Sequence, residues 1–274
     1  MNASSAAPLR VGVAGLGAIG WKVATTLSAG IDGLSLVAVA GRDAAKTATQ
    51  AEALPAMPRA ATPVELPDLV DVVVDCAPSA AFAALANASV AAGRVFVSVN
   101  AGALLNNLDL VDKARASGAR LIVPTGALLG LDAVRAAAEG NIERVVMITR
   151  KPPNGLEGAP YLVERGISLT GLTEARMVFE GTAAEGARGF PANVNVAAAL
   201  GLAGIGPDRT RLQIWADPAI DRNMHAIEVE ADSARFRLQI ENVPSAENPR
   251  TGKITALSVI ACLRGLTAPL RVGT

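Results

Sequence analysis

Residues 9–20 read LRVGVAGLGAIG, a short apolar run followed by three glycines in the spacing GxGxxG. Leu9 to Ala14 has the length and composition of a fully buried strand, and a helix with an apolar face is expected from about Trp21 to Ala29. A glycine-rich turn between a strand and a helix is the fingerprint of dinucleotide binding. The chain is therefore predicted to open with a phosphate-binding α/β unit.

Each glycine of this loop has a separate physical role. Gly15 allows the tight turn after the strand, Gly17 lets a diphosphate approach bare backbone, and Gly20 lets helix and strand pack closely. The amides at the start of the helix, from Gly17 through Ala18 and Ile19 to Gly20, attract negative charge. A glycine-rich turn without a ligand is the alternative, but its position directly after the first apolar strand favours a nicotinamide cofactor.

More strands and helices alternate behind this unit. Further apolar, β-branched runs lie at Leu34–Ala40, Val70–Cys76, Val95–Val99 and Arg120–Pro124, with Ala-rich helical stretches between them. Alternating strands and helices predict a Rossmann-type, doubly wound parallel sheet. Ligands of such sheets bind beyond the carboxyl ends of the strands.

The pattern of apolar and polar residues changes after residue 125. Longer strands, several with alternating polar and apolar residues, are expected at Ile142–Thr149, Ala175–Glu180, Arg211–Ala216, His225–Glu230 and Ala234–Ile240. Alternation favours a sheet with one solvated or differently packed face. Helices are expected at Pro191–Gly204 and Thr251–Leu266, and the last one is expected to pack back onto the first domain.

The amino-acid composition argues against nucleic acid and membranes as binding partners. The 25 basic and 25 acidic side chains cancel, so no broad field would gather nucleic acid or anionic lipid. Apolar runs are too short to span a bilayer, and residues 1–8 lack the features of a secretory signal, which predicts a cytoplasmic protein. Cys76 and Cys262 are isolated thiols, too few and too dispersed for a disulfide framework or a metal site.

Cofactor selectivity is expected just after the second strand. Arg42 could pair with a 2'-phosphate, and the alternative is a solvated loop residue. Asp43 lies one residue too far along for a ribose contact. We therefore expect NAD or NADP to be accepted. The nicotinamide ring is expected over strand ends near Cys76, Ala101 and Ala127, and Ala77 is expected to contact the cofactor.

Three sites in the second half bear on chemistry. His225, the single histidine, could move a proton near neutral pH, although a lone histidine is often structural. Arg150 and Lys151 end a strand before two prolines and could grip a substrate carboxylate, or form an exposed basic pair. Asn193 could cap a helix and contact substrate, whereas Asn195 is expected to contact the cofactor.

Several motifs, in order and nearly throughout the chain, resemble L-aspartate dehydrogenases. They lie at residues 15–20, 97–103, 125–127, 149–152, 179–183, 190–198, 202–204, 216–218, 223–225 and 248–251.

The resemblance implies a dinucleotide-binding domain of residues 1–125 plus 246–274 and an inserted α/β (α+β) substrate and dimerisation domain of residues 126–245. It also implies a homodimer and a reversible NAD(P)-linked conversion of aspartate to iminosuccinate, which hydrolyses to oxaloacetate. His225 falls on the family's active-site histidine, and Ala127 and Asn195 fall on its cofactor contacts.

The chain departs from the family pattern at Thr125, Leu128, Leu129 and Gly252. These departures leave open a dehydrogenase or imine reductase that acts on another small dicarboxylate or amino acid. An NAD(P)-binding regulatory protein without turnover is a further alternative, and a histidine kept in its family context speaks against it.

Overall fold

The computed structural model describes residues 7–191, 194–245, 247–248 and 251–273. The chain divides into two compact units, which are treated separately below. Unit 1 consists of the chain up to Pro124 together with Ala256–Val272, and unit 2 consists of Thr125–Thr255 together with Gly273. No helix among the described residues has the length and apolar character needed to cross a membrane.

Unit 1 alternates strands and helices along its first 124 residues. Its elements are β1 (Leu9–Ala14), α1 (Ala18–Ala29), β2 (Leu34–Ala40), α2 (Ala44–Glu52), β3 (Arg59–Ala61), α3 (Leu66–Leu69), β4 (Val72–Asp75), the 3-10 helix η1 (Ser79–Ala81), α4 (Phe82–Ala91), β5 (Val95–Ser98), α5 (Ala101–Leu105), α6 (Asp109–Ser117) and β6 (Arg120–Ile122).

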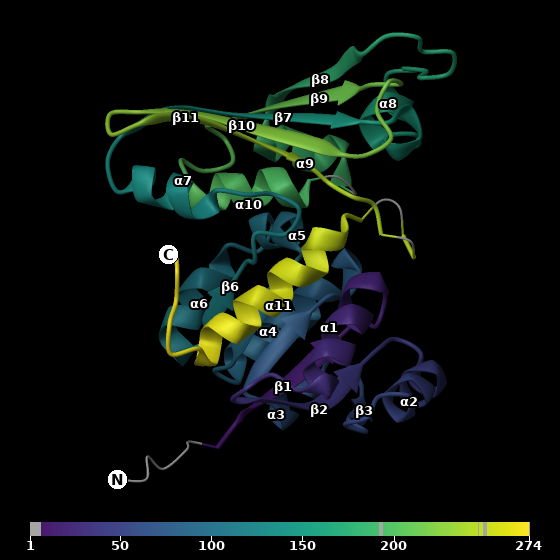
Figure 1. The fold of residues 1–274 in the computed structure, drawn as a ribbon, viewed down its shortest axis with the longest axis vertical. Helices are drawn as coiled ribbons and strands as arrows, with labels where there is room; N and C mark the ends of the chain where they lie inside the picture. Colours follow the sequence, from purple (N-terminus) through teal and green to yellow (C-terminus); the bar gives the residue numbers. More distant parts are fainter. Residues whose placement is uncertain (1–6, 192–193, 246, 249–250, 274) are drawn as a thin grey trace. The chain divides into compact units, whose positions relative to one another are not determined.

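The sheet of unit 1 has the strand order β3-β2-β1-β4-β5-β6, and its strands pair in parallel (Figure 1). The order reverses between β1 and β4, where doubly wound folds bind their ligands. Val11 and Val13 face a core shared with α1, whereas Gly12 on the opposite face abuts Leu66 of α3. Apolar layers on both faces explain why these strands read as continuous hydrophobic runs.

A helix from far along the chain completes this first core. Most of α11 (Lys253–Thr267) belongs to unit 1, and its buried side chains Val259, Ile260 and Leu263 pack in the same cluster as Val13 of β1. Figure 1 shows this yellow helix alongside the purple α1. The predicted return of the last helix to the first domain is confirmed.

Unit 2 is built on a second sheet. Its elements are α7 (Leu131–Ala138), β7 (Ile142–Lys151), the 3-10 helix η2 (Pro153–Gly155), α8 (Pro160–Glu164), β8 (Arg176–Thr182), α9 (Ala183–Gly189), α10 (Asn195–Ala203), β9 (Thr210–Ala216), β10 (Met224–Ala231) and β11 (Arg235–Glu241). The strand order is β11-β10-β7-β9-β8, with β7 and β9 parallel and the other pairs antiparallel.

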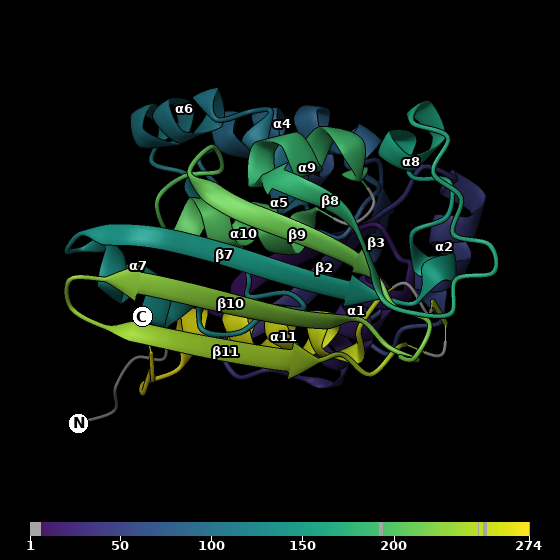
Figure 2. The ribbon, with the colours of Figure 1, turned by 90° about the horizontal axis from the view of Figure 1, so that it is seen from above.

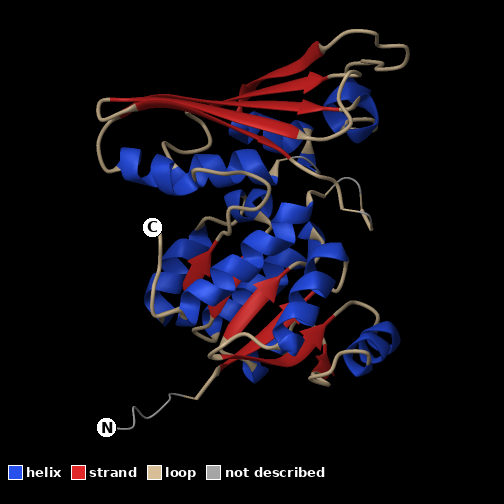
Figure 3. Ribbon diagram, viewed as in Figure 1, coloured by secondary structure: helices blue, strands red, loops and turns tan. Residues whose placement is uncertain are grey.

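One face of the second sheet carries the core of unit 2. Met147, Leu212 and Ile227 lie there with Val134 of α7 and Leu200 of α10. Figure 2 looks onto the other face, and Figure 3 shows the strands of this sheet in red edge-on above the helices α7 and α10. Residues that alternate along a strand therefore face either the helices or the opposite side.

The α/β architecture predicted from the sequence is confirmed, with small differences in the elements. The short strand β3 (Arg59–Ala61) at the edge of the first sheet was not predicted, because its residues are mostly exposed and give no apolar run. Helix α10 begins at Asn195 rather than near Pro191. Residues 192–193 lie outside the described part of the chain.

Candidate active site

The glycine loop connects β1 to α1 in unit 1. Gly15 has a φ of 84°, and a Cβ on it would come within 2.6 Å of backbone atoms of Ala77 and Cys76. A Cβ on Gly20 would collide with the carbonyl oxygen of Gly15. A Cβ on Gly17 would have no atom within 4 Å, so this position opens to free space. The first and third glycines are thus required by packing, and the second leaves a space beside bare backbone.

The start of α1 suits an anion. Gly17 is the N-cap and provides no side-chain cap, and the first turn carries no acidic residue. The first amides of a helix, here those of Ala18, Ile19 and Gly20, have no acceptor within the helix and carry the positive end of its dipole. The residues present therefore fit the diphosphate of a dinucleotide.

The loop after β2 holds Arg42 and Asp43. Arg42 is exposed, so its guanidinium can reach a ligand in solution. Asp43 is the N-cap of α2, and its carboxylate accepts a hydrogen bond of 3.0 Å from the amide of Lys46. Asp43 therefore caps a helix in this structure.

A buried polar network lies at the ends of β4 and β5. The carboxylate of Asp75 accepts hydrogen bonds from Ser98 Oγ (2.7 Å), Asn100 Nδ2 (2.9 Å) and the amide of Ala77 (3.1 Å). Burial raises the pKa of Asp75, and these hydrogen bonds act in the opposite direction. Asn100 Nδ2 also donates to the carbonyl oxygen of Ala77 at 2.9 Å.

Cys76, Ala77 and Ala101 lie directly beside this network. Cys76 follows β4 and donates its amide to Ala14 of β1 at 2.8 Å, while Ala101 begins α5. Desolvation raises the pKa of the Cys76 thiol, with a further contribution from Asp75, so the thiol stays protonated. Within unit 1, the structure thus brings these residues together with Gly15.

His225 lies at the start of β10 in unit 2. It pairs across the strands with Thr149 of β7, and Thr149 Oγ1 is 3.1 Å from His225 Nδ1. The histidine is only 3% exposed. Burial lowers its pKa to about 3, and the positive charge of Lys151 adds to this effect. The imidazole is therefore neutral in the free protein.

Alternation along β7 separates the two basic residues of the Arg150-Lys151 pair. Lys151 is two residues from Thr149, so it lies on the same face of the sheet as Thr149 and His225, and it is buried. Arg150 points to the opposite face, where Trp215 of β9 is its cross-strand neighbour.

Partners on that opposite face engage Arg150. Its guanidinium forms an ion pair of 3.1 Å with Asp217 and lies 4.9 Å from the centre of the Trp215 ring. The structure does not bring Arg150 together with His225, so we do not assign it to the substrate site. The pattern that predicted the pair contained no information about which residue would face the histidine.

The remaining predicted contacts lie in loops and at a helix start of unit 2. The carbonyl oxygen of Ala127 accepts a hydrogen bond of 3.0 Å from Asn242 Nδ2. Asn195 is the first residue of α10 and is exposed, and Val194 occupies the N-cap. Asn193 lies outside the described residues.

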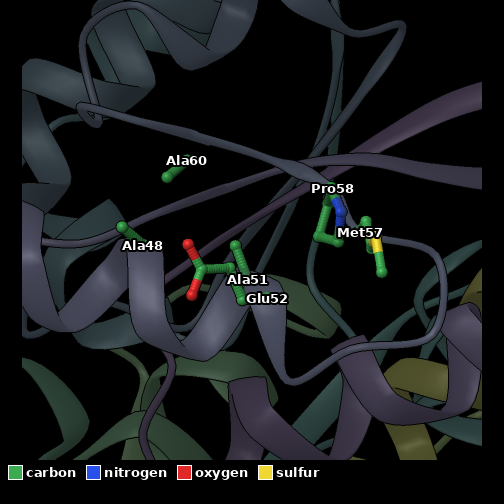
Figure 4. A pocket seen from close by; sticks show the side chains of 6 residues that line it. All are labelled: Ala48, Ala51, Glu52, Met57, Pro58 and Ala60. Carbon is green, nitrogen blue, oxygen red and sulfur yellow. The ribbon is translucent and has the colours of Figure 1, made fainter.

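A small pocket lies beside α2 in unit 1 (Figure 4). It is lined by Ala48, Ala51, Glu52, Met57, Pro58 and Ala60. The lining contains none of the predicted site residues and one ionisable side chain. We do not assign a function to it. No group of three or more potential metal-ligating side chains occurs within the described ranges.

The sequence analysis missed the polar residues that support these sites. Asp75 was hidden in an apolar strand, although an acid within such a run was a usable signal. Thr149 and Asn242 gave no signal, since their value depends on cross-strand and loop neighbours that the sequence does not reveal.

Comparison with known proteins gives the family. Residues 132–266 match the family described as "Aspartate dehydrogenase, C-terminal", and residues 15–124 match "Homoserine dehydrogenase, NAD binding domain". The chain is 56% identical to the L-aspartate dehydrogenase of Bradyrhizobium diazoefficiens over 99% of this chain and 96% of that protein. It belongs to the L-aspartate dehydrogenase family. The resemblance inferred from the motifs is thereby confirmed.

A second relative and a solved structure support the same family assignment and fold. L-aspartate dehydrogenase 3 of Bordetella bronchiseptica is 53% identical over 99% of this chain and 100% of that protein. The crystal structure of aspartate dehydrogenase from Thermotoga maritima has the same fold, with a TM-score of 0.76 at 24% identity, and covers 97% of this chain and 99% of that one. The chain is an NAD(P)-dependent amino acid dehydrogenase, as the sequence predicted.

Proposed function

We propose that the protein oxidises L-aspartate reversibly with NAD+ or NADP+. A hydride leaves Cα and a proton leaves the amino group, which gives iminosuccinate, and water then hydrolyses this imine to oxaloacetate and ammonia. The names of the curated relatives support the substrate. The observation that carries the proposal is the row of Thr149, Lys151 and His225 on one face of the second sheet.

Lys151 is the proposed carboxylate ligand. An ammonium group at a buried position forms a strong charge-assisted hydrogen bond with an anion. Lys151 is 6% exposed and shares its sheet face with the histidine, which favours a small anionic substrate. A dicarboxylate would bring two negative charges to the sheet face on which this buried lysine lies.

His225 is the proposed proton acceptor. If Thr149 Oγ1 accepts from Nδ1–H, the lone pair of Nε2 is directed to the substrate. The pKa of about 3 makes the imidazole a weak base in the free protein. Because negative charge raises the pKa of a neighbouring histidine, a bound dicarboxylate would counteract the effect of Lys151, which is the smaller of the two causes of the low pKa; the larger effect, burial, would remain.

The cofactor contacts proposed for unit 1 are Gly15, Gly17, Ala18, Ile19, Gly20, Arg42, Cys76, Ala77 and Ala101. For unit 2, the family resemblance supports Ala127 and Asn195 as proposed cofactor contacts. When bound, the nicotinamide supplies the hydride acceptor. Arg42 is proposed to accommodate a 2'-phosphate, which supports use of either cofactor.

The open face of the second sheet supports a homodimer. Arg150, Trp215 and Met177 form one row across β7, β9 and β8, and Met177 is 40% exposed. Sedimentation of the purified protein tests this part of the proposal.

Cys76 and Cys262 are free thiols, in keeping with a cytoplasmic location.

Absorbance of NADH and NADPH tests the activity directly. We expect consumption of reduced cofactor with oxaloacetate plus ammonia, and its formation with aspartate. The chain departs from the family pattern at Thr125, Leu128, Leu129 and Gly252, which leaves other substrates open. A panel of other amino acids and dicarboxylates, assayed in parallel, tests these alternatives. Turnover with another member of that panel, and none with aspartate, would contradict the substrate assignment.

A further inference from the structure

Asp75 occupies the point of the first sheet at which the strand order reverses. It is the last residue of β4, and it pairs with Ala14 of β1 on one side and with Ser98 of β5 on the other. Ligands of doubly wound sheets bind beyond this point. A fully buried carboxylate is costly there unless it is well hydrogen-bonded, so its presence needs a reason.

The hydrogen bonds of Asp75 connect two loops. One carboxylate oxygen accepts from the amide of Ala77, in the loop after β4. The other accepts from Ser98 at the end of β5 and from the side chain of Asn100, just before α5. Ser98 Oγ in turn accepts from the amide of Asn100 at 3.0 Å. Since every contact to the carboxylate is a donor, the network fixes both loops around one acceptor group.

The loop after β4 lies against the glycine loop, which has backbone hydrogen bonds of its own. The backbone of Ala77 lies so close to Gly15 that a Cβ there would come within 2.6 Å of it. The glycine loop itself is held independently, by the bond from the Gly15 amide to Ala40 (2.8 Å) and by the bond from Trp21 to Gly17 (2.8 Å). A shift of Ala77 would therefore alter the loops after β4 and β5 more than the glycine loop.

We propose that Asp75, with Ser98 and Asn100, is a positioning residue that presets the loops after β4 and β5 to receive the nicotinamide half of the cofactor. This role rests on the cofactor site proposed above and is independent of the identity of the substrate. Preorganised loops lose less entropy on binding, which gives tighter binding.

Two variants and a control test the proposal. Asp75→Asn places an amide donor against Ala77 or against Ser98 and Asn100. Ser98→Ala removes one donor to the carboxylate and the acceptor of the Asn100 amide, with little change in shape. Ser89→Ala is the control, because Ser89 is also fully buried in unit 1 but donates only within α4, to Leu85 at 2.7 Å. All three are measured below their unfolding temperatures, with NADH and with ADP-ribose, which lacks the nicotinamide.

The expected result is a selective loss. Asp75→Asn and Ser98→Ala should weaken NADH binding about tenfold, because buried groups lose their hydrogen-bond partners. ADP-ribose affinity should stay unchanged, as should both affinities in Ser89→Ala. In turnover, the KM for the cofactor should rise without a change in the KM for aspartate.

Other outcomes overturn the proposal. Unchanged NADH affinity in both variants, even with a lowered melting temperature, would show that the network is merely structural. An equal loss of NADH and ADP-ribose affinity would assign it to the glycine loop. A wild-type protein that binds neither ligand would overturn the cofactor site itself, whereas failure with aspartate alone would leave this inference standing.

Discussion

His225 is held in an environment that suppresses its charge. Burial and the positive charge of Lys151 both favour the neutral imidazole, and Thr149 fixes the orientation of the ring through Nδ1. A neutral and oriented base is ready to accept a proton once an anionic substrate has entered. The rate should therefore depend on this residue, and cofactor affinity should not.

Replacement of His225 by Asn tests that role. An amide can keep the contact with Thr149 but cannot act as a base near neutral pH, so kcat should fall roughly 100- to 10,000-fold. Steady-state kinetics gives this loss, and an NADH titration should show unchanged affinity. Loss of NADH binding in the variant would indicate a structural role for the histidine instead.

Neighbouring residues of β7 provide a matched pair for the substrate contact. Lys151→Met should raise the KM for aspartate about 100-fold, because a buried cation that holds a carboxylate is lost. Arg150→Met removes a charge one residue away but on the opposite face, and should leave that KM nearly unchanged. Equal effects in the two variants would show that general electrostatic attraction, rather than a specific contact, binds the substrate.

Among the elements, the turn between β1 and α1 depends on glycine for two different reasons. Gly20 lets the helix approach the carbonyl oxygen of Gly15, whereas Gly17 has open space where a side chain would lie. The same residue type therefore serves packing at Gly20, and at Gly17 it leaves room for the proposed diphosphate.

Alanine substitutions separate these two roles. Gly17→Ala should leave the melting temperature nearly unchanged and weaken NADH binding, because the added methyl group lies where the diphosphate approaches. Gly20→Ala should lower the melting temperature, since its methyl group collides with backbone. Thermal unfolding and NADH titration of both proteins check this, and a stable Gly20→Ala protein would contradict the packing argument.

Prediction from the sequence succeeded where an element is determined by its own residues. The run from Leu9 to Ala14 and the glycines after it specify a strand and a turn locally, and β1 has the predicted bounds. The edge strand β3 and the facing of Arg150 depend on neighbouring strands. The buried partners of Asp75 come from a different strand and loop, so no local pattern could reveal them.

At the scale of the whole molecule, the buried histidine links stability to pH. Its pKa is about 3 in the folded protein and about 6.5 when unfolded. Below pH 6.5 the histidine is protonated in the unfolded chain but stays neutral in the folded protein. Its contribution to the free energy of unfolding is therefore fully present above pH 6.5 and is lost progressively as the pH falls towards 3.

This linkage predicts a measurable difference between two proteins. Between pH 8 and pH 5 the wild-type protein should lose about 2 kcal/mol more unfolding free energy than the His225→Asn variant. Urea denaturation of both at several pH values provides the comparison. Parallel pH profiles would mean that the imidazole is accessible to protons in the folded state.

The packing of α11 against β1 also has a consequence for biosynthesis. Val259, Ile260 and Leu263 share a core with Val11 and Val13, which leave the ribosome long before them. Until α11 has left the ribosome, the nascent chain exposes the hydrophobic surface that α11 covers in the folded protein. Exposed hydrophobic surface of this kind promotes aggregation. Newly made chains should therefore need chaperone protection until α11 has been synthesised.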